Sequence, residues 1–361
     1  MCRPSVSKTV VVASPAQRLA AGQRARPPLI APFDWPDTPL GVIKTAQGYT
    51  FFGSDGDTHS NGRSGSIVAT AGTLDDPLGS GAPLDVTIAS NPDTAVNPNY
   101  RSYGYMGGGP VFRVPPGLPG AGNLLATYHA ELPNDPLYAA LGLAASADNG
   151  AHWTDLGEIV RLNQAYAPGL DGFEIGDGPL VLSRDGAYFY LYFPDWIANG
   201  TPHATSTTVV SVARAPALAL LRAAFGATPH AVPFEKFYRG TWDLQPGIGG
   251  ASTDLDPASQ YAGYLDIHED PELGRYVMIV SNDTSFAYAE SLDGLTWTVP
   301  IPLGTYGPIA AYPTAVGLGA DPRILGRTFY VYYTTLPDDG TGWTNGALRR
   351  LTVSCSSARP R

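Results

Sequence analysis

The sequence predicts an all-β fold, a five-bladed β-propeller, from three observations. Segments rich in aromatic and β-branched residues alternate with turns of Gly, Asp and Pro from about residue 33 onward. These segments repeat loosely about every 65 residues, a length that holds four strands with their loops. Two of the repeats end in related turns, at residues 146–153 and 291–297, with the order Ser-x-Asp, then Gly, then Trp.

In these two turns each side chain has an expected structural role. The aspartate accepts backbone N–H groups, the glycine takes a positive φ, and the tryptophan, Trp153 or Trp297, packs against the next hairpin. Such a turn marks a blade and carries no chemistry. A propeller places its chemistry at the mouth of the central channel, where the first strands of all blades converge.

The strands are expected in five groups, with one helix rich in Ala and Leu at residues 215–225. The groups are 41–54 and 66–72; 109–113, 123–131 and 139–146; 179–183, 188–193 and 209–214; 263–268, 275–281 and 285–290; and 312–317, 328–334 and 347–353. No linker-like run divides them. We therefore predict one catalytic domain over residues 33–355, preceded by a disordered or targeting tail over residues 1–32.

The composition excludes several classes of function. The 361 residues are 43% hydrophobic and only 15% charged, with 42 Gly and 34 Pro, which is typical of a turn-rich globular chain. The net charge of −10 argues against nucleic acid and anionic membranes as partners. No run approaches the ~18 apolar residues that span a bilayer, so no membrane insertion is expected.

The two ends of the chain leave two questions open. Cys2 and Cys355 are the only cysteines, and a propeller brings its ends together, so a disulfide is geometrically conceivable although Cys2 falls in the expected tail. The apolar run at residues 10–13 is too short for a clear signal peptide. An extracellular or secreted location is expected without a clear signal.

Acidic residues recur at positions expected to face one end of the channel. Glycoside hydrolysis needs two carboxyl groups, a proton donor with a raised pKa and a base or nucleophile, and different blades can supply them. Asp177 is the preferred acid because it precedes Gly-Pro and a buried-looking strand, where a carboxylate has no turn to cap. Asp57, Asp37 and Glu131 are the candidate partners. For any one Asp the alternative role is a turn or strand cap.

Further side chains near these positions are expected to bind substrate, although each aromatic one could instead pack between blades. They are Arg63, Arg113, His129, Glu174, Asp266, His268 and Trp242. No His-x-His or His-Glu-x-x-His spacing predicts a metal site. No cofactor is expected to be required, and a structural calcium ion on acidic loops is possible.

Two segments resemble family 43 glycoside hydrolases. Residues 177–192, which begin Asp-Gly-Pro, resemble the Glu-Gly-Pro segment that carries the general acid of that family, with Asp in place of the longer Glu. Residues 36–54 are similar to the first-blade segment of the family, whose base would correspond to Asp37. The second-blade Asp of the family has no match, because Gly109, Pro110 and their neighbours stand there.

A second resemblance covers about residues 40–335. Residues 51–64, 237–250 and 291–294 look like the domain family numbered 4185, which includes endo-D-arabinanases of the five-bladed type. This resemblance implies a glycoside hydrolase that cleaves a furanose-rich polysaccharide such as arabinan. We expect the protein to be a monomer.

Two alternatives remain. Residues 111–115, with Arg113, resemble the Arg-Ile-Pro region of sialidases, in which the arginine binds a substrate carboxylate. A sialidase also needs two further arginines and a Tyr–Glu pair, which cannot be assigned here. The other alternative is a non-catalytic carbohydrate-binding propeller. Two carboxyl groups about 5–9.5 Å apart would distinguish an enzyme from it.

Overall fold

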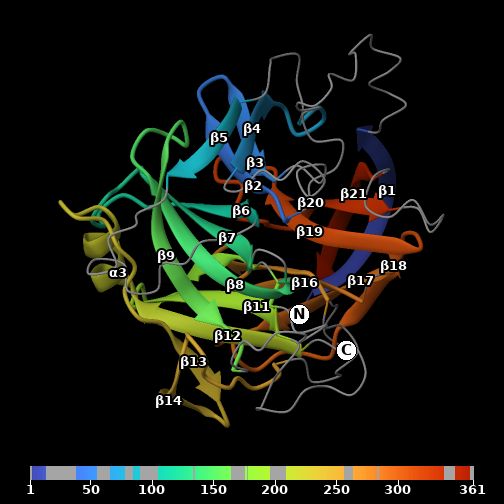
Figure 1. Cartoon of the computed structure of the whole chain (residues 1–361). Coiled ribbons are helices and arrows are strands. Elements are labelled where there is room, and N and C mark those ends of the chain that lie inside the picture. The colour runs from blue at the N-terminus through green and yellow to red at the C-terminus, as the bar shows by residue number, and fades with distance from the viewer. Residues whose placement is uncertain are drawn as a thin grey trace.

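The structure is a computed structural model that describes residues 2–13, 38–54, 66–77, 84–89, 105–132, 135–163, 175–176, 178–195, 209–255, 263–282, 284–336 and 346–357. Its strands form a five-bladed β-propeller, with the blades arranged around a central channel (Figure 1). The predicted fold class is therefore confirmed.

Each blade is an antiparallel sheet whose first strand lies innermost. Blade I contains β2 (Gly41–Thr45), β3 (Gly48–Gly53), β4 (Ser66–Gly72) and β5 (Leu84–Ala89). Blade II contains β6 (Tyr105–Arg113), β7 (Leu124–Leu132), β8 (Asp135–Ser146) and β9 (Trp153–Arg161). Blade III contains β10 (Leu180–Leu182), β11 (Tyr188–Asp195), β12 (Val209–Pro216), β13 (Glu235–Tyr238) and β14 (Thr241–Pro246). Blade IV contains β15 (Leu265–Asp270), β16 (Arg275–Ser281), β17 (Ser285–Ser291) and β18 (Ile301–Thr305). Blade V contains β19 (Ile309–Gly317), β20 (Thr328–Leu336), β21 (Ala347–Ser357) and β1 (Cys2–Ala13).

The hydrophobic core is divided into five clusters, one between each pair of neighbouring blades. Successive side chains of a strand point to opposite faces, so one strand serves two clusters. In β20, Phe329 and Val331 pack toward blade IV, whereas Tyr332 packs toward blade I. The cluster between blades V and I closes the ring.

The two Ser-x-Asp turns have the expected geometry. In the first, Asp148 Oδ1 accepts the His152 N–H at 2.9 Å and Gly150 has φ 89°. Trp153 is buried edge-on against Phe52 of blade I, with 5.9 Å between the ring centroids. In the second turn Trp297 packs in the same way against a tyrosine of blade III. These tryptophans join neighbouring blades.

Of the two alternatives predicted for the tail, disorder is wrong for residues 2–13, and residues 14–32 lie outside the described residues. Residues 2–13 form β1, which pairs with β21 as the outermost strand of blade V (Figure 1). Cys2 and Cys355 form a disulfide across this pair, with 5.1 Å between their Cα atoms. A single strand whose partner lies about 340 residues away has no hairpin signal, which is why composition alone indicated a tail.

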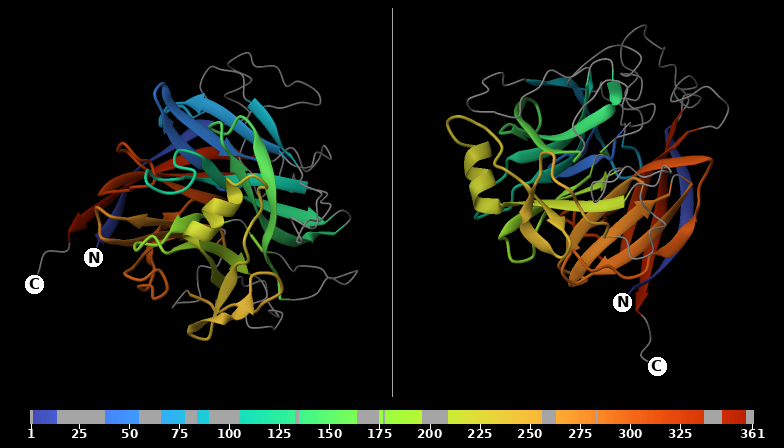
Figure 2. Two further views of the ribbon diagram at one scale, coloured as in Figure 1. Left: turned by 90° about the vertical axis from the view of Figure 1, so that its left-hand side faces the viewer. Right: turned by 60° about the horizontal axis from the view of Figure 1, so that its bottom comes forward.

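The chain between β12 and β13 contains helix α3 (Ala217–Ala224), inside the range predicted for it. Leu220 and Leu221 of this helix are buried in the cluster between blades II and III. The hairpin β13–β14 was not expected, and Figure 2 shows it with the helix at the periphery of the molecule. Its turn has positive φ at both Arg239 and Gly240, as two-residue turns of type I′ require.

Candidate active site

The propeller has two ends, and the innermost strands define them. We call the end at which β2, β6, β10, β15 and β19 begin the upper end, and the end at which they finish the lower end. Because the strands of a blade are antiparallel, the second strand of each blade finishes at the upper end. Asp37, Asp57, Arg63, Glu174 and Asp177 lie outside the described residues, but described neighbours of Asp37 and Asp177 fall at the upper end.

Blade II anchors both of these neighbouring segments. Thr38 Oγ1 donates to the carbonyl oxygen of Gly108 at 3.0 Å, and Ser54 Oγ lies 3.2 Å from Thr38 Oγ1. On the other side, Thr127 Oγ1 donates to the carbonyl oxygen of Gly178 at 3.0 Å. The residues that follow Asp37 and Asp177 are therefore both fixed to the β6–β7 hairpin.

The glycine run at residues 107–109 makes the first of these approaches possible. A Cβ on Gly108 would lie 2.2 Å from the Ile67 side chain, and a Cβ on Gly109 would lie 2.9 Å from the carbonyl oxygen of Pro39. Any other residue would push blade I away from β6. The run is a packing feature of the site.

The segment around residue 177 is held equally closely. A Cβ on Gly178 would lie 1.6 Å from the carbonyl oxygen of Tyr192, and Gly176 N–H donates to the carbonyl oxygen of Pro194 at 3.0 Å. Ile175 also forms a bridge with Asp195. The backbone on both sides of residue 177 is thus clamped to β11.

A buried network of charged side chains adjoins these contacts with β11. The sequence analysis did not predict it. Lys236 Nζ donates to the carbonyl oxygens of Arg161 and Gly250 at 2.7 and 2.8 Å and lies 3.9 Å from Asp195 Oδ2. Ser252 Oγ donates to the same carboxylate oxygen at 2.7 Å. Burial lowers the pKa of Lys236 to about 8, although the charge of Asp195 opposes the shift. A lysine between aromatic residues in a short strand was the available signal.

His129 and Glu131 belong to the upper end. They lie on β7, opposite Gly107 and Tyr105 at the start of β6, and both are buried. His129 Nε2 is 3.4 Å from Glu131 Oε1. The structure therefore brings one of the four predicted carboxylates together with a predicted binding histidine, on the hairpin that anchors Thr38 and Gly178.

The remaining predicted binding residues lie elsewhere, which corrects the expectation of one shared end. Arg113 finishes β6 at the lower end, where its Nη1 donates to Gly122 and Asn149, and burial and the charge of Arg323 lower its pKa. Asp266, the second residue of β15, and His268 line a channel cavity that extends to the lower end. The grouping failed for Arg113 because it finishes a first strand, whereas His129 and Glu131 lie near the end of a second strand that runs in the opposite direction.

Trp242 lies on β14, on the outer side of blade III, and not in the channel. The guanidinium of Arg214 lies 4.2 Å from its ring centroid, and Tyr190 stacks on it with an interplanar angle of 3°. Phe237 packs against it as well. With these neighbours the indole serves packing, the alternative considered for each aromatic residue.

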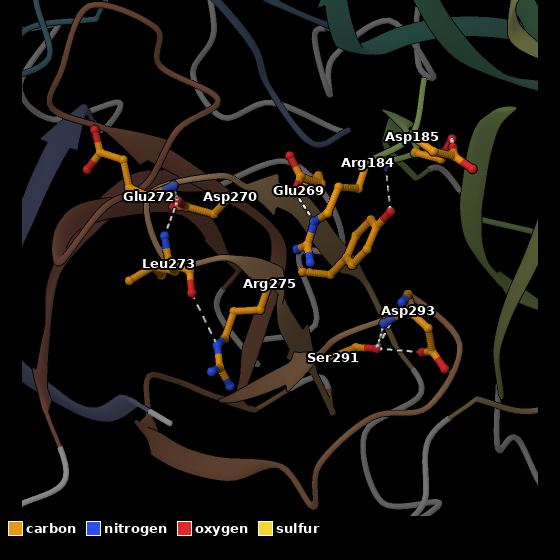
Figure 3. Close-up of polar contacts among 12 residues, drawn as sticks. Arg184, Asp185, Glu269, Asp270, Glu272, Leu273, Arg275, Ser291 and Asp293 are labelled. Atoms are coloured by element: carbon orange, nitrogen blue, oxygen red, sulfur yellow. Dashed lines mark hydrogen bonds and ion pairs between the residues drawn. The ribbon is translucent and has the colours of Figure 1, made fainter. Parts of the chain in front are cut away.

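Figure 3 shows the turns of blades III and IV at the lower end. Arg184 Nε donates to Glu269 Oε1 at 2.9 Å, and Asp270 Oδ1 accepts the N–H groups of Glu272 and Leu273. Across the described ranges, no group of three or more His, Cys, Asp or Glu side chains is placed to hold a metal ion. No helix in those ranges is both long and apolar enough to cross a bilayer.

Comparison with known proteins gives a likeness in fold. No protein-family model and no curated protein sequence matches the chain. A family 117 glycoside hydrolase from the marine bacterium Zobellia galactanivorans superposes with a TM-score of 0.50 at 10% identity, covering 98% of this chain and 91% of the other. At that identity the likeness concerns the fold alone.

Two further solved structures are similar over most of both chains. A GH43_1 enzyme from Xanthomonas citri has a TM-score of 0.48 at 11% identity, with 89% and 88% of the two chains covered. The RS223-β-xylosidase has a TM-score of 0.48 at 14% identity, with 90% and 93% covered. Both scores are too low for an inference about this chain.

Proposed function

We propose that the protein is a glycoside hydrolase that cleaves a furanose-rich polysaccharide such as arabinan at the upper end of the propeller. The observation that carries the proposal is the anchoring of two segments to one hairpin. The described neighbours of Asp37 and Asp177 both hydrogen-bond to β6–β7, which also holds the buried pair His129 and Glu131. Carboxyl groups from different blades could converge there, as glycoside hydrolysis requires.

In this mechanism Asp177 protonates the leaving oxygen, and Asp37 or Asp57 acts as the base or nucleophile. Glu131 is the remaining candidate catalytic carboxylate. Its position on a rigid strand suits a role in holding substrate or setting the charge of the site. Arg63, Glu174 and His129 are proposed to bind the sugar. The glycoside hydrolase fold of the Zobellia galactanivorans protein supports the reaction class.

We propose an exported monomer. The disulfide between Cys2 and Cys355 supports export, because disulfides persist in oxidising compartments. A structural calcium ion remains part of the proposal and is checked by following the melting temperature with and without a chelator.

A sialidase-like activity is the second candidate but has weaker support. Its main sequence feature was Arg113, which finishes β6 at the lower end and donates to Gly122 and Asn149. A non-catalytic carbohydrate-binding propeller is the third candidate. It fits the same fold and differs only in the absence of turnover.

The deciding experiment incubates the protein with arabinans, xylans, galactans and sialosides and resolves the products by chromatography. Release of arabinose or arabino-oligosaccharides supports the proposal, and their length distribution distinguishes endo from exo cleavage. Release of sialic acid alone favours the second candidate. Binding without any product favours the third.

A further inference from the structure

The channel contains a cavity of about 300 Å³ that extends from the first residues of β10 and β15 to the lower end, and the proposed reaction does not use it. We call it the lower channel cavity. Its walls are mainly apolar, and five prolines contribute to them: Pro110, Pro115, Pro179, Pro271 and Pro322. The volume lies at the lower limit of small-molecule sites, which range over roughly 300–1,000 Å³. Proline rings and strand side chains give it rigid walls, which reduces the entropy lost when a ligand binds.

Asp266 is a buried carboxylate in this cavity, and only one of its two oxygens binds other groups in the ranges that the structure describes. Asp266 Oδ2 accepts the backbone N–H of Ala315 at 2.6 Å and lies 2.8 Å from His268 Nε2. The Asp266 side chain is only 7% exposed. Both hydrogen bonds that Asp266 makes within the described part of the chain use Oδ2, and neither uses its other oxygen, Oδ1. A ligand that donates a hydrogen bond would satisfy it.

The charges around the cavity are balanced. His268 Nδ1 lies 2.9 Å from the carbonyl oxygen of Arg323, so both ring nitrogens face acceptors and the ring is a cation paired with Asp266. Arg323 pairs with Asp321, and Arg184 pairs with Glu269. A balanced site favours a neutral polar ligand over an ion, because an added charge would lose hydration without a counter-charge.

Arg184 provides a second polar group at the rim. Its side chain is 43% exposed, and its Nε is occupied by Glu269. Its Nη groups donate to no other residue in the described part of the chain. A ligand acceptor could therefore be bound at the rim while a ligand donor reaches Asp266 inside.

We propose that the lower channel cavity binds a neutral mono- or disaccharide, with a sugar hydroxyl donating to Asp266 Oδ1 and another accepting from Arg184. Sugars combine apolar C–H faces with hydroxyl groups, which matches apolar walls with few polar contacts. The inner end of the cavity is lined by Leu40 and Pro179, three residues after Asp37 and two after Asp177. The site thus lies behind the proposed catalytic segments, and it does not depend on hydrolysis at the upper end.

The test measures binding of L-arabinose, D-xylose and D-galactose by saturation-transfer NMR and calorimetry. The primary variant is Asp266→Asn. Its amide oxygen can take the place of Oδ2 and keep the bonds to Ala315 and His268, which puts an NH₂ donor where Oδ1 was. We expect at least tenfold weaker binding of the preferred sugar, about the effect of losing a hydrogen bond to a charged group. Thermal unfolding monitors the fold.

A second variant keeps the test independent of the Asp266 bonds. Arg184→Met removes a half-exposed ion pair, so its stability should change little, and binding should weaken about threefold to tenfold. Arg222→Met is the matched control, because Arg222 is an exposed arginine on α3. It should leave binding unchanged.

Each outcome bears on the proposal. Unchanged binding in both Asp266→Asn and Arg184→Met, or no saturable sugar binding by the wild type, overturns it. D-galactosamine binding tenfold more tightly than D-galactose overturns the preference for a neutral ligand. Sugar binding that Asp37→Asn removes and the lower-site variants leave intact belongs to the upper end, and also overturns the proposal. Binding lost in the lower-site variants of a protein that hydrolyses no polysaccharide supports this site and contradicts the proposed function.

Discussion

The surroundings of His268 favour its protonated form. Burial lowers its pKa, but the charge of Asp266 and hydrogen bonds to Asp266 and to the carbonyl oxygen of Arg323 outweigh this, so its pKa lies above the ordinary 6.5. Lys236 shows the opposite case, because burial outweighs the attraction of Asp195. Two basic residues in the interior therefore respond to pH in opposite senses.

The raised pKa of His268 predicts a pH-dependent stability. The folded protein holds the proton more tightly than the unfolded chain, so this stabilisation is complete below pH 6.5 and is lost as the pH rises through the folded pKa. Free energies of unfolding should be measured across this window for the wild type and His268→Gln. The difference between them should shrink as the pH rises. A difference that is constant with pH would contradict a protonated His268.

Asp177→Asn should abolish hydrolysis while leaving the fold intact. Asn keeps the shape but cannot deliver a proton, and general acid catalysis contributes about 10²–10⁴ in rate. Activated aryl glycosides need less protonation of the leaving group, so the variant should recover partly on them. Asp37→Asn and Asp57→Asn should separate the two base candidates, since only one should be nearly inactive. Near wild-type turnover by Asp177→Asn on the polymer would make Glu174 or Glu131 the next acid to test.

At the level of strands and turns, packing between blades dominates. The tryptophans that end the Ser-x-Asp turns do not reach the channel: Trp153 contacts Phe52 of blade I, and Trp297 contacts Tyr192 of blade III. The sequence pattern predicts these roles because the turn fixes where the indole points. The same pattern could not predict Trp242, whose neighbours Arg214 and Tyr190 come from other strands.

Trp153→Ala should therefore lower the free energy of unfolding by about 3–5 kcal/mol, the usual cost of removing a buried indole. Trp297→Ala should behave similarly. Leu292→Ala is the control, because Leu292 lies in the second turn but is 69% exposed; it should change stability by less than about 0.5 kcal/mol. Denaturant unfolding and hydrolysis should be measured together. Full stability with lost hydrolysis in a tryptophan variant would show that its role is not structural.

For the whole molecule, the sequence predicts what is local. The runs rich in aromatic residues at 188–193 and 328–334 predict β11 and β20, and the Ala- and Leu-rich run predicts α3. It does not predict β1, whose partner is β21 at the other end of the chain. The sequence also predicts the candidate site only in part. Arg113 and His268 can be assigned to an end of the channel only when the direction of each strand in its blade is known.

The last blade is held by two chain ends. β1 pairs with β21 along its length, as Figures 1 and 2 show, and the disulfide joins the pair across a sequence separation of 353 residues. The N–H of Cys2 also donates to buried Glu290 of blade IV at 2.8 Å, and Glu290 accepts from Tyr288 and Arg275. Ring closure therefore depends on backbone pairing, a covalent bond and a buried carboxylate at one place.

The double variant Cys2→Ser/Cys355→Ser should lower the free energy of unfolding by about 2–4 kcal/mol, because the disulfide restricts a very long loop in the unfolded chain. Stability should be lost locally, in the last blade, as well as in the free energy of global unfolding. Without the bond, β1 can separate from β21, so hydrogen exchange should accelerate in both strands and stay unchanged in β6 and β7 of blade II. The exposed edge of β21 could then pair with a second copy, which size-exclusion chromatography would detect as dimer. Equal acceleration in all five blades would mean that β1 does not open separately from the rest of the ring.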